Sequence, residues 1–358
     1  MVLLASLLMK TTTPVYTIGL DLGDKRHAIC VLDSAGEIVD ERTITNHRES
    51  LRRLAKKYPR ARVALEVGSH SPWTSRFLKE QNLEVIVANP RKFRAVYQSD
   101  RKSDERDAQM LARMARVDPQ LLYPVRHGSE QAQRDLLQVK LRDNLVSQRV
   151  NIINAVRFTL KALGIKVPSP NTASFAKRAR IVLGEAHGNM LALVEPSLQV
   201  LDELTHQIYQ LDRAIERLCE ESYPETALLR KIRGVGPITA LCFVLVVEDH
   251  ERFAKARDVG AYLGLVPKRD QSGAVDKRLG ISKAGNSYLR CLLVQSAQYI
   301  IGPFGPDSDL KRYGLMLAER GGRGAKRKAI VATARKLSVL LLTLWKDERE
   351  YQPLRDAA

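Results

Sequence analysis

The chain has 358 residues, with 58 Lys and Arg against 40 Asp and Glu, and therefore a formal net charge of +18 at pH 7. Its length favours two or three domains over a single hydrophobic core, and 44% hydrophobic with 27% charged residues excludes an intrinsically disordered chain. So large a positive charge favours a polyanionic partner, with nucleic acid as the leading candidate, although a merely basic protein has the same composition.

The chain opens with the apolar stretch Met1–Lys10, which lacks the basic region and cleavage site of a secretory signal. We interpret residues 1–14 as a frayed N-terminal extension. No apolar run approaches the ~20 residues that a membrane span needs, so no membrane partner is expected. Four cysteines without a Cys-x-x-Cys pair argue against a zinc ribbon or a disulfide framework and favour a reducing cytosol.

Residues 15–128 have the pattern of an α/β domain. Three β-rich runs come first, with the turn Ser34–Gly36 between the second and third, and helices then alternate with strands. The predicted elements are strands at 16–21, 27–33, 37–45, 61–67 and 83–88, and helices at 48–58, 74–81 and from about 103. A three-strand meander followed by this alternation predicts a ribonuclease-H-like (RuvC-like) sheet.

Four carboxylates stand at or near the ends of these elements: Asp21, Glu66, Asp104 and Asp107. Asp21 and Glu66 belong to apolar strands, where burying an acid is costly unless it pairs or binds a metal. Asp104 and Asp107 follow the expected N-cap residue Ser103 and share one helix face, because they are three residues apart. Together the four acids predict a phosphodiester site with divalent metal, Mg²⁺ or Mn²⁺, on oxygen ligands.

Each acid also has a structural interpretation, as a helix cap, a turn residue or a partner of an arginine, and only their combination with the predicted sheet favours chemistry. Actin-like phosphotransferases share the Gly-x-Asp-x-Gly pattern of Gly19–Gly23. They place a hydroxyl residue shortly after the second glycine, whereas this chain has Asp24, Lys25 and Arg26. An ATP-binding protein is therefore the weaker interpretation.

Residues 129–222 are predicted to form a central helical, coiled-coil segment. Two apolar stripes have helical spacing: Val139, Val146, Val150, Ile153, Val156, Leu160 and Leu163; and Leu201, Leu204, Ile208, Leu211, Ile215 and Leu218. Alternating spacings of three and four make the second stripe a short heptad seam. An intramolecular helical hairpin and a dimerising coiled coil both fit this seam, and both interpretations stay open.

A mainly α-helical domain is expected over residues 223–348, followed by a tail at 349–358. Gly234 and Gly236 resemble the turn of a helix-hairpin-helix element, whose free N–H groups suit a DNA phosphate. The alternative is an ordinary helix cap, since a Gly-x-Gly turn is often no more than that.

Ser272 stands beside Gly273 in a predicted loop flanked by cations that could hold a scissile phosphate. Such a serine is ordinarily a turn residue, and no base partner is visible in the sequence. A second basic cluster near the C-terminus predicts a backbone-binding patch, with a solvated helix start as the alternative. The predicted nucleic-acid contacts are Lys268, Arg269, Lys277, Arg278, Lys283, Arg290, Arg323, Lys326, Arg327 and Lys328.

With both halves laid out, the chain resembles the insertion-sequence transposase family numbered one hundred and ten from Tyr16 to about Trp345. The motifs that carry the resemblance are Gly19-Leu-Asp21, Leu65-Glu66, Asn89-Pro90, Lys102-Ser-Asp104-x-x-Asp107-Ala, Gly234-Val-Gly236, Ala261-Tyr-Leu-Gly264-Leu-x-Pro267, Ser272-Gly273 and Ile281-Ser-Lys283-Ala-Gly285-Asn. The resemblance implies a RuvC-like domain, a coiled-coil region and a C-terminal transposase domain.

The resemblance also implies a mechanism: the four acids bind Mg²⁺, and Ser272 attacks a DNA phosphate to leave a covalent phosphoserine link. It implies a composite site between protomers of a homodimer that assembles to a tetramer. Donor and target DNA would be chosen by an element-encoded guide (bridge) RNA, in the cytoplasm of a prokaryote and at the nucleoid when acting. Two alternatives remain: a RuvC-like Holliday-junction endonuclease that hydrolyses DNA with the acids alone, and a non-catalytic nucleic-acid-binding protein.

Overall fold

The computed structural model describes residues 15–93, 103–168, 171–186, 188–272 and 275–354. The chain divides into two compact units, residues 1–130 and residues 131–358. Within the described ranges, no helix is both long enough and apolar enough to span a membrane.

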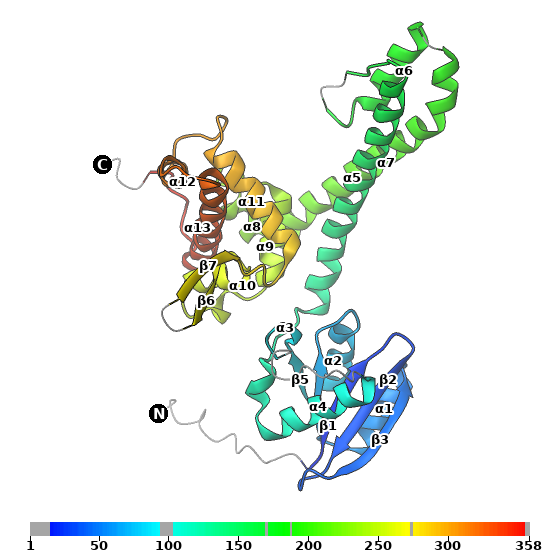
Figure 1. The fold of residues 1–358 in the computed structure, drawn as a ribbon, viewed down its shortest axis with the longest axis vertical. Helices are drawn as coiled ribbons and strands as arrows, with labels where there is room; N and C mark the ends of the chain where they lie inside the picture. The colour runs from blue at the N-terminus through cyan, green and yellow to red at the C-terminus, as the bar shows by residue number, and fades with distance from the viewer. Residues whose placement is uncertain (1–14, 94–102, 169–170, 187, 273–274, 355–358) are drawn as a thin grey trace. The chain divides into compact units, whose positions relative to one another are not determined.

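The first unit is built on a five-stranded sheet in the order β3-β2-β1-β4-β5 (Figure 1). Its strands are β1 (Thr17–Leu22), β2 (Arg26–Leu32), β3 (Ile38–Thr45), β4 (Arg62–Glu66) and β5 (Glu84–Ala88). Strands β1, β2 and β3 pair antiparallel as a meander, whereas β4 pairs parallel to β1 and β5 parallel to β4. The predicted α/β class and strand order are confirmed, and the topology is consistent with a ribonuclease-H-like domain.

Helices cover both faces of this sheet. The helices of this unit are α1 (Arg48–Lys57), α2 (Ser71–Glu80), α3 (Pro90–Phe93) and α4 (Asp104–Val117), of which α1, α2 and α4 pack on the sheet. Because side chains alternate along a strand, Ile18 and Leu20 of β1 pack with α1 and α2 on one face. On the other face, Ala64 of β4 packs with α4.

Small residues let α4 lie very close to β1 and β2. Ala108 and Ala112 of α4 pack with Ala28 and Cys30 of β2. A Cβ atom on Gly19 of β1 would overlap the main-chain carbonyl oxygen of Ala108 and the main-chain nitrogen of Ala112. The absence of a side chain at this position therefore sets the distance between the helix and the sheet.

The core of the second unit is a group of packed helices. Its main helices are α8 (Glu225–Leu229), α9 (Pro237–Val247), α10 (Val259–Tyr262), α11 (Ser287–Ile301), α12 (Asp309–Glu319) and α13 (Ala325–Asp347). Eight of the eleven residues of α9 are buried, as expected for a helix that is apolar all round. A separate two-stranded hairpin joins β6 (Pro267–Ser272) to β7 (Val275–Ile281).

The predicted central helical segment forms α5 (Glu130–Ala162), α6 (Phe175–Ala186) and α7 (Gly188–Glu221). Arg142 of α5 pairs with Asp212 of α7 at 2.8 Å, and Arg149 lies 3.4 Å from Thr205. The later residue of α5, Arg149, contacts the earlier residue of α7, Thr205, so the two long helices run antiparallel within one chain. These contacts favour the intramolecular hairpin. Leu163, predicted to lie in the apolar stripe, instead follows the end of α5 and is 61% exposed.

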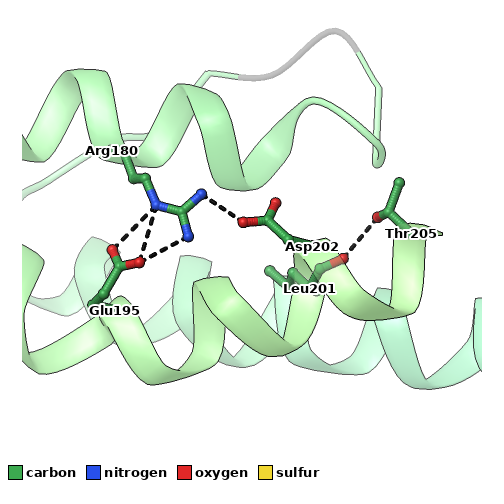
Figure 2. A network of polar contacts seen from close by, with 5 residues as sticks. All are labelled: Arg180, Glu195, Leu201, Asp202 and Thr205. Atoms are coloured by element: carbon green, nitrogen blue, oxygen red, sulfur yellow. Dashed lines mark hydrogen bonds and ion pairs between the residues drawn. The ribbon is translucent and has the colours of Figure 1, made fainter. Parts of the chain in front are cut away.

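Arg180 ties α6 to α7 through two carboxylates. Figure 2 shows its guanidinium between Glu195, with the shortest contact at 2.8 Å, and Asp202 at 2.7 Å. Phe175 of α6 packs in an apolar cluster with Leu198 of α7 and residues of α5. Because Arg180 is partly exposed, its ion pairs orient α6 more than they stabilise the unit.

Candidate active site

The sheet register brings two of the four predicted acids together. Leu20 of β1 pairs with Leu65 of the parallel strand β4, so the next residues, Asp21 and Glu66, are neighbours about 4.8 Å apart in strand spacing. Each lies two residues beyond a residue that contacts α4, Gly19 in β1 and Ala64 in β4. Both carboxylates therefore belong to the α4 face, at the carboxyl ends of their strands.

The orientation of α4 places its first turn at this same end of the sheet. Near its C-terminus, the Ala115 carbonyl accepts a hydrogen bond from Nη1 of Arg62, the first residue of β4, at 3.1 Å. Arg116 donates to the Ser34 carbonyl at 2.7 Å, close to where β2 ends opposite the start of β1. The helix therefore runs antiparallel to β1 and β4, and it begins near Asp21 and Glu66.

Asp104 and Asp107 lie on the helix stripe that faces the sheet. They precede the buried residues Ala108 and Leu111 by four positions each, and residues four apart share a helix face. Ser103 caps the helix as predicted: its Oγ accepts a hydrogen bond from the Arg106 N–H at 3.4 Å. Asp104 is exposed and Asp107 half-buried. All four acids thus gather at one edge and on one face.

The donor chemistry of this edge fits a hard divalent cation, which prefers carboxylate oxygens. In the part of the chain that the structure describes, however, no three His, Cys, Asp or Glu side chains are close enough together to form a metal site. The strands and the helix bring the four residues to one edge of the sheet, but their carboxylate groups do not converge on a single point where an ion could bind.

A second polar group at this end of the unit was not foreseen. Asp24, which follows β1, contacts Nε2 of His70 at 2.9 Å, and the Trp73 indole N–H donates to the other ring nitrogen at 3.3 Å. The sequence offers no spacing signal for this trio, because Asp24 is 46 residues away from His70.

Ser272 lies in the second unit, and its local structure differs from the predicted loop. It is the last residue of β6 and pairs with Val275 of β7. The hairpin also carries Arg269 opposite Arg278, and Lys277 opposite Asp270. The polar residues on either side of Ser272 form two short extended strands, because antiparallel pairing between β6 and β7 satisfies their backbone N–H and C=O groups. A strand pair with this many cations is typical of a surface that binds a polyanion.

Arg290 holds the base of this hairpin. Its Nη1 donates to the carbonyls of Leu263 at 3.0 Å and Ala284 at 2.7 Å. A Cβ on Gly264 or Gly285 would overlap main-chain atoms of the opposite segment, so the two segments touch backbone to backbone. These contacts support a positioning role for Arg290, and its direct contact with nucleic acid stays a prediction.

The remaining predicted contacts lie on helix ends and turns. Gly234 and Gly236 form the connection between α8 and α9, and Lys283 lies in the segment after β7. Arg323 is exposed, as are Lys326, Arg327 and Lys328 in the first turn of α13. Cations are unfavourable at a helix N-terminus, so this arrangement favours an anionic partner over a helix-stabilising role.

Comparisons with known proteins agree with these features. A family model described as a transposase matches residues 18–165, and one described as the transposase IS116/IS110/IS902 family matches residues 226–312. The transposase for insertion sequence element IS1111A of Coxiella burnetii is 27% identical, over 94% of this chain and 92% of its own. A probable family 20 transposase of Pseudomonas aeruginosa is 27% identical, over 94% and 98%.

The putative transposase y4rJ of Sinorhizobium fredii is 30% identical, over 90% of this chain and 84% of its own. Similarity along both units, together with the two family matches, confirms the resemblance that the motifs indicated. The chain therefore belongs to the IS116/IS110/IS902 family of insertion-sequence transposases, enzymes that cleave and rejoin DNA.

Proposed function

We propose that this transposase exchanges DNA strands through a covalent intermediate on Ser272, with Asp21, Glu66, Asp104 and Asp107 holding Mg²⁺ or Mn²⁺. The observation that carries this proposal is the gathering of the four acids at the carboxyl ends of β1 and β4. Carboxylate oxygens are the ligands that a hard divalent cation prefers, and a group of four at one edge supplies enough of them for such a cation.

The serine step is a transesterification. The Ser272 oxygen forms a bond to phosphorus, one ester P–O bond of the DNA breaks, and the leaving strand takes a proton in place of the one that the hydroxyl loses. A second strand end then attacks the phosphoserine and releases Ser272. The bound cation would supply charge neutralisation at the phosphate and help the oxygen nucleophile or leaving group.

Asp104 and Glu105 provide a matched test of the acids. Both stand in the first turn of α4 and favour the helix dipole equally, but only Asp104 lies on the sheet-facing stripe. Asp104→Asn should lower strand exchange about a thousandfold, whereas Glu105→Gln should leave it nearly unchanged. The measurement is recombination of a plasmid that carries the element's ends, at saturating Mg²⁺. Equal activity of the two variants would refute the metal role.

Ser272→Ala separates strand transfer from the hydrolytic alternative. The acids form their group in the first unit without any contribution from Ser272, and this favours a Holliday-junction endonuclease as the second candidate function. The variant should form no protein–DNA adduct on a denaturing gel and exchange no strands. Full exchange would end the serine proposal, and continued cleavage without exchange or adduct would favour the endonuclease.

We also propose an element-encoded guide (bridge) RNA, a homodimer that assembles to a tetramer, and action at the nucleoid. The charge of +18 supports RNA and DNA as joint partners. The division of residues 129–348 into a helical segment at 129–222 and a transposase domain at 223–348 belongs to the same proposal. Purification from cells that carry the whole element, followed by sequencing of bound RNA, tests the guide; no enriched RNA would contradict it.

A further inference from the structure

A cavity of about 440 Å³ opens beside the connection between α8 and α9. Arg230 and Arg233 lie on one side of it, and Tyr299 of α11 on another. Its described lining contains no Asp or Glu. The positive end of the α9 dipole points toward the same connection. The electrostatics of the cavity therefore favour an anion.

The two glycines of this connection have different surroundings. Gly234 has φ +100°, and a Cβ there would lie 2.9 Å from Cδ1 of Tyr299, so both backbone and packing require glycine. Gly236 has φ −89° and ψ 178°, which any residue adopts. Apart from its own chain neighbours, no atom of the described residues lies within 4 Å of where its Cβ would be. The fold needs the first glycine, whereas the second leaves open space over the start of α9.

Unused donors face this open space. The N–H groups of Ile238 and Thr239 have no backbone acceptor among the described residues, and the first bonded amide of α9 is that of Ala240, which donates to the Gly236 carbonyl. Orphan amides at a helix N-terminus are suited to phosphate oxygens.

Two buried hydroxyls point to the same conclusion. Thr239 is 7% exposed and Ser296 is 4% exposed, and both line the cavity. Neither hydroxyl forms a hydrogen bond with any part of the chain that the structure describes. Neither hydroxyl oxygen is among the fully buried, unpartnered atoms of the described residues, so both oxygens are reachable from the cavity and available to a ligand there.

We propose that this cavity binds a phosphodiester group of DNA, held by the Ile238 and Thr239 amides, the two hydroxyls and Arg233. Arg230 is already paired with Glu216 at 2.6 Å, so Arg233 supplies most of the countercharge. The choice of DNA as the source of the phosphate rests on the proposed function. The open space at Gly236 is what lets a phosphate reach the amides.

Gly236→Ala tests this site, with Gly188→Ala as the matched control. Gly188 also begins a helix, and a Cβ there meets no atom within 4 Å. Binding of fluorescein-labelled duplex DNA to the full chain is measured by anisotropy in EDTA over a range of KCl. Gly236→Ala should weaken binding on the order of tenfold and reduce the slope of log K against log salt by about 0.9, the value for one phosphate contact. Gly188→Ala should change neither.

Thr239→Val removes one hydroxyl with little change of shape and should weaken binding severalfold. Wild-type affinity and salt slope in both variants would overturn the site. If the two variants bind duplex DNA normally but lose only binding of single-stranded RNA, the ligand is not DNA. The same conclusion follows if they lose only the binding of inorganic phosphate. Because the assay needs no catalysis, failure of the wild-type chain to bind duplex DNA at all would instead count against the proposed function as well.

Discussion

The α4–β1 contact of the first unit and the α9 cavity of the second unit each depend on a glycine, with opposite surroundings. At Gly19 the place of the missing side chain is filled by the backbone of α4, and at Gly236 it is empty. Both glycines belong to motifs that indicate nucleic-acid chemistry in the sequence. The comparison teaches that what lies around a glycine, rather than its place in a motif, separates a packing requirement from a ligand site.

The largest expected effect is that of Gly19→Ala. Because the new Cβ would overlap main-chain atoms of Ala108 and Ala112, α4 must move away from the sheet, and we expect a loss of about 2–4 kcal/mol of stability in the first unit. The chain has two tryptophans, Trp73 and Trp345. Urea unfolding followed by Trp73 fluorescence in a Trp345→Phe background measures the first unit alone.

Gly68→Ala is the control for this change, since no atom lies within 4 Å of a Cβ at Gly68. It should leave the unfolding midpoint almost unchanged. If Gly19→Ala has the same unfolding midpoint as this control, the close contact does not hold α4 on the sheet. Gly19 would then not be a packing requirement.

Much of the first unit could be predicted from sequence because its signals are local. Apolar runs and turn residues define the strands, and Ser103 followed by Asp104 defines the start of α4. The four acids could be recognised for the same reason. Their shared edge could not, because it depends on strand register and on the antiparallel course of α4, which arise from contacts between distant residues.

The second unit was less predictable. The seam at residues 201–218 has the same period whether its partner is α5 or another chain, so periodicity could not choose the hairpin. Arg290 is predicted to contact nucleic acid because its charge is visible in the sequence, and that contact stays a prediction. Its bonds to two carbonyls could not be predicted, because they depend on the fold. The α9 cavity depends on two hydroxyls, Thr239 and Ser296, that are far apart in the chain.

His27 of the first unit contrasts with the hydroxyls of the α9 cavity, because its polar side chain is buried within the unit, whereas the hydroxyls line a cavity that could hold a ligand. His27 is fully buried, and among the described residues no group lies in good hydrogen-bond geometry to either ring nitrogen, so its interaction with Asn46 is a weak one. Burial, with a smaller contribution from nearby His70, lowers the pKa of His27 below its usual 6.5, although Asn46 opposes the shift. The unfolded chain therefore takes up a proton below about pH 6.5 that the folded chain does not.

Stability of the first unit should accordingly fall as the pH drops below about 6.5, by up to about 1.4 kcal/mol per pH unit from this residue, until the folded pKa is reached. In His27→Leu the dependence should be flatter, because the titrating group is gone and the volume is roughly kept. Trp73-detected urea unfolding between pH 7.5 and 5 measures both proteins. Parallel curves would mean that the pKa of His27 is the same in the folded and the unfolded chain, and they would contradict the prediction.

The smallest expected effect is that of Gly236→Ala on stability. Alanine is a slightly poorer N-cap residue than glycine, but it also restricts the unfolded chain, and the two effects nearly cancel at a φ of −89°. We expect a change within about 0.5 kcal/mol, measured by Trp345 fluorescence in a Trp73→Phe background. Trp345 reports on α9 directly, because its ring contacts Phe243 with centroids 6.4 Å apart. A loss of about 2 kcal/mol would show that Gly236 is required by the fold, as Gly19 is, and weaker DNA binding by that variant would then need no phosphate in the cavity.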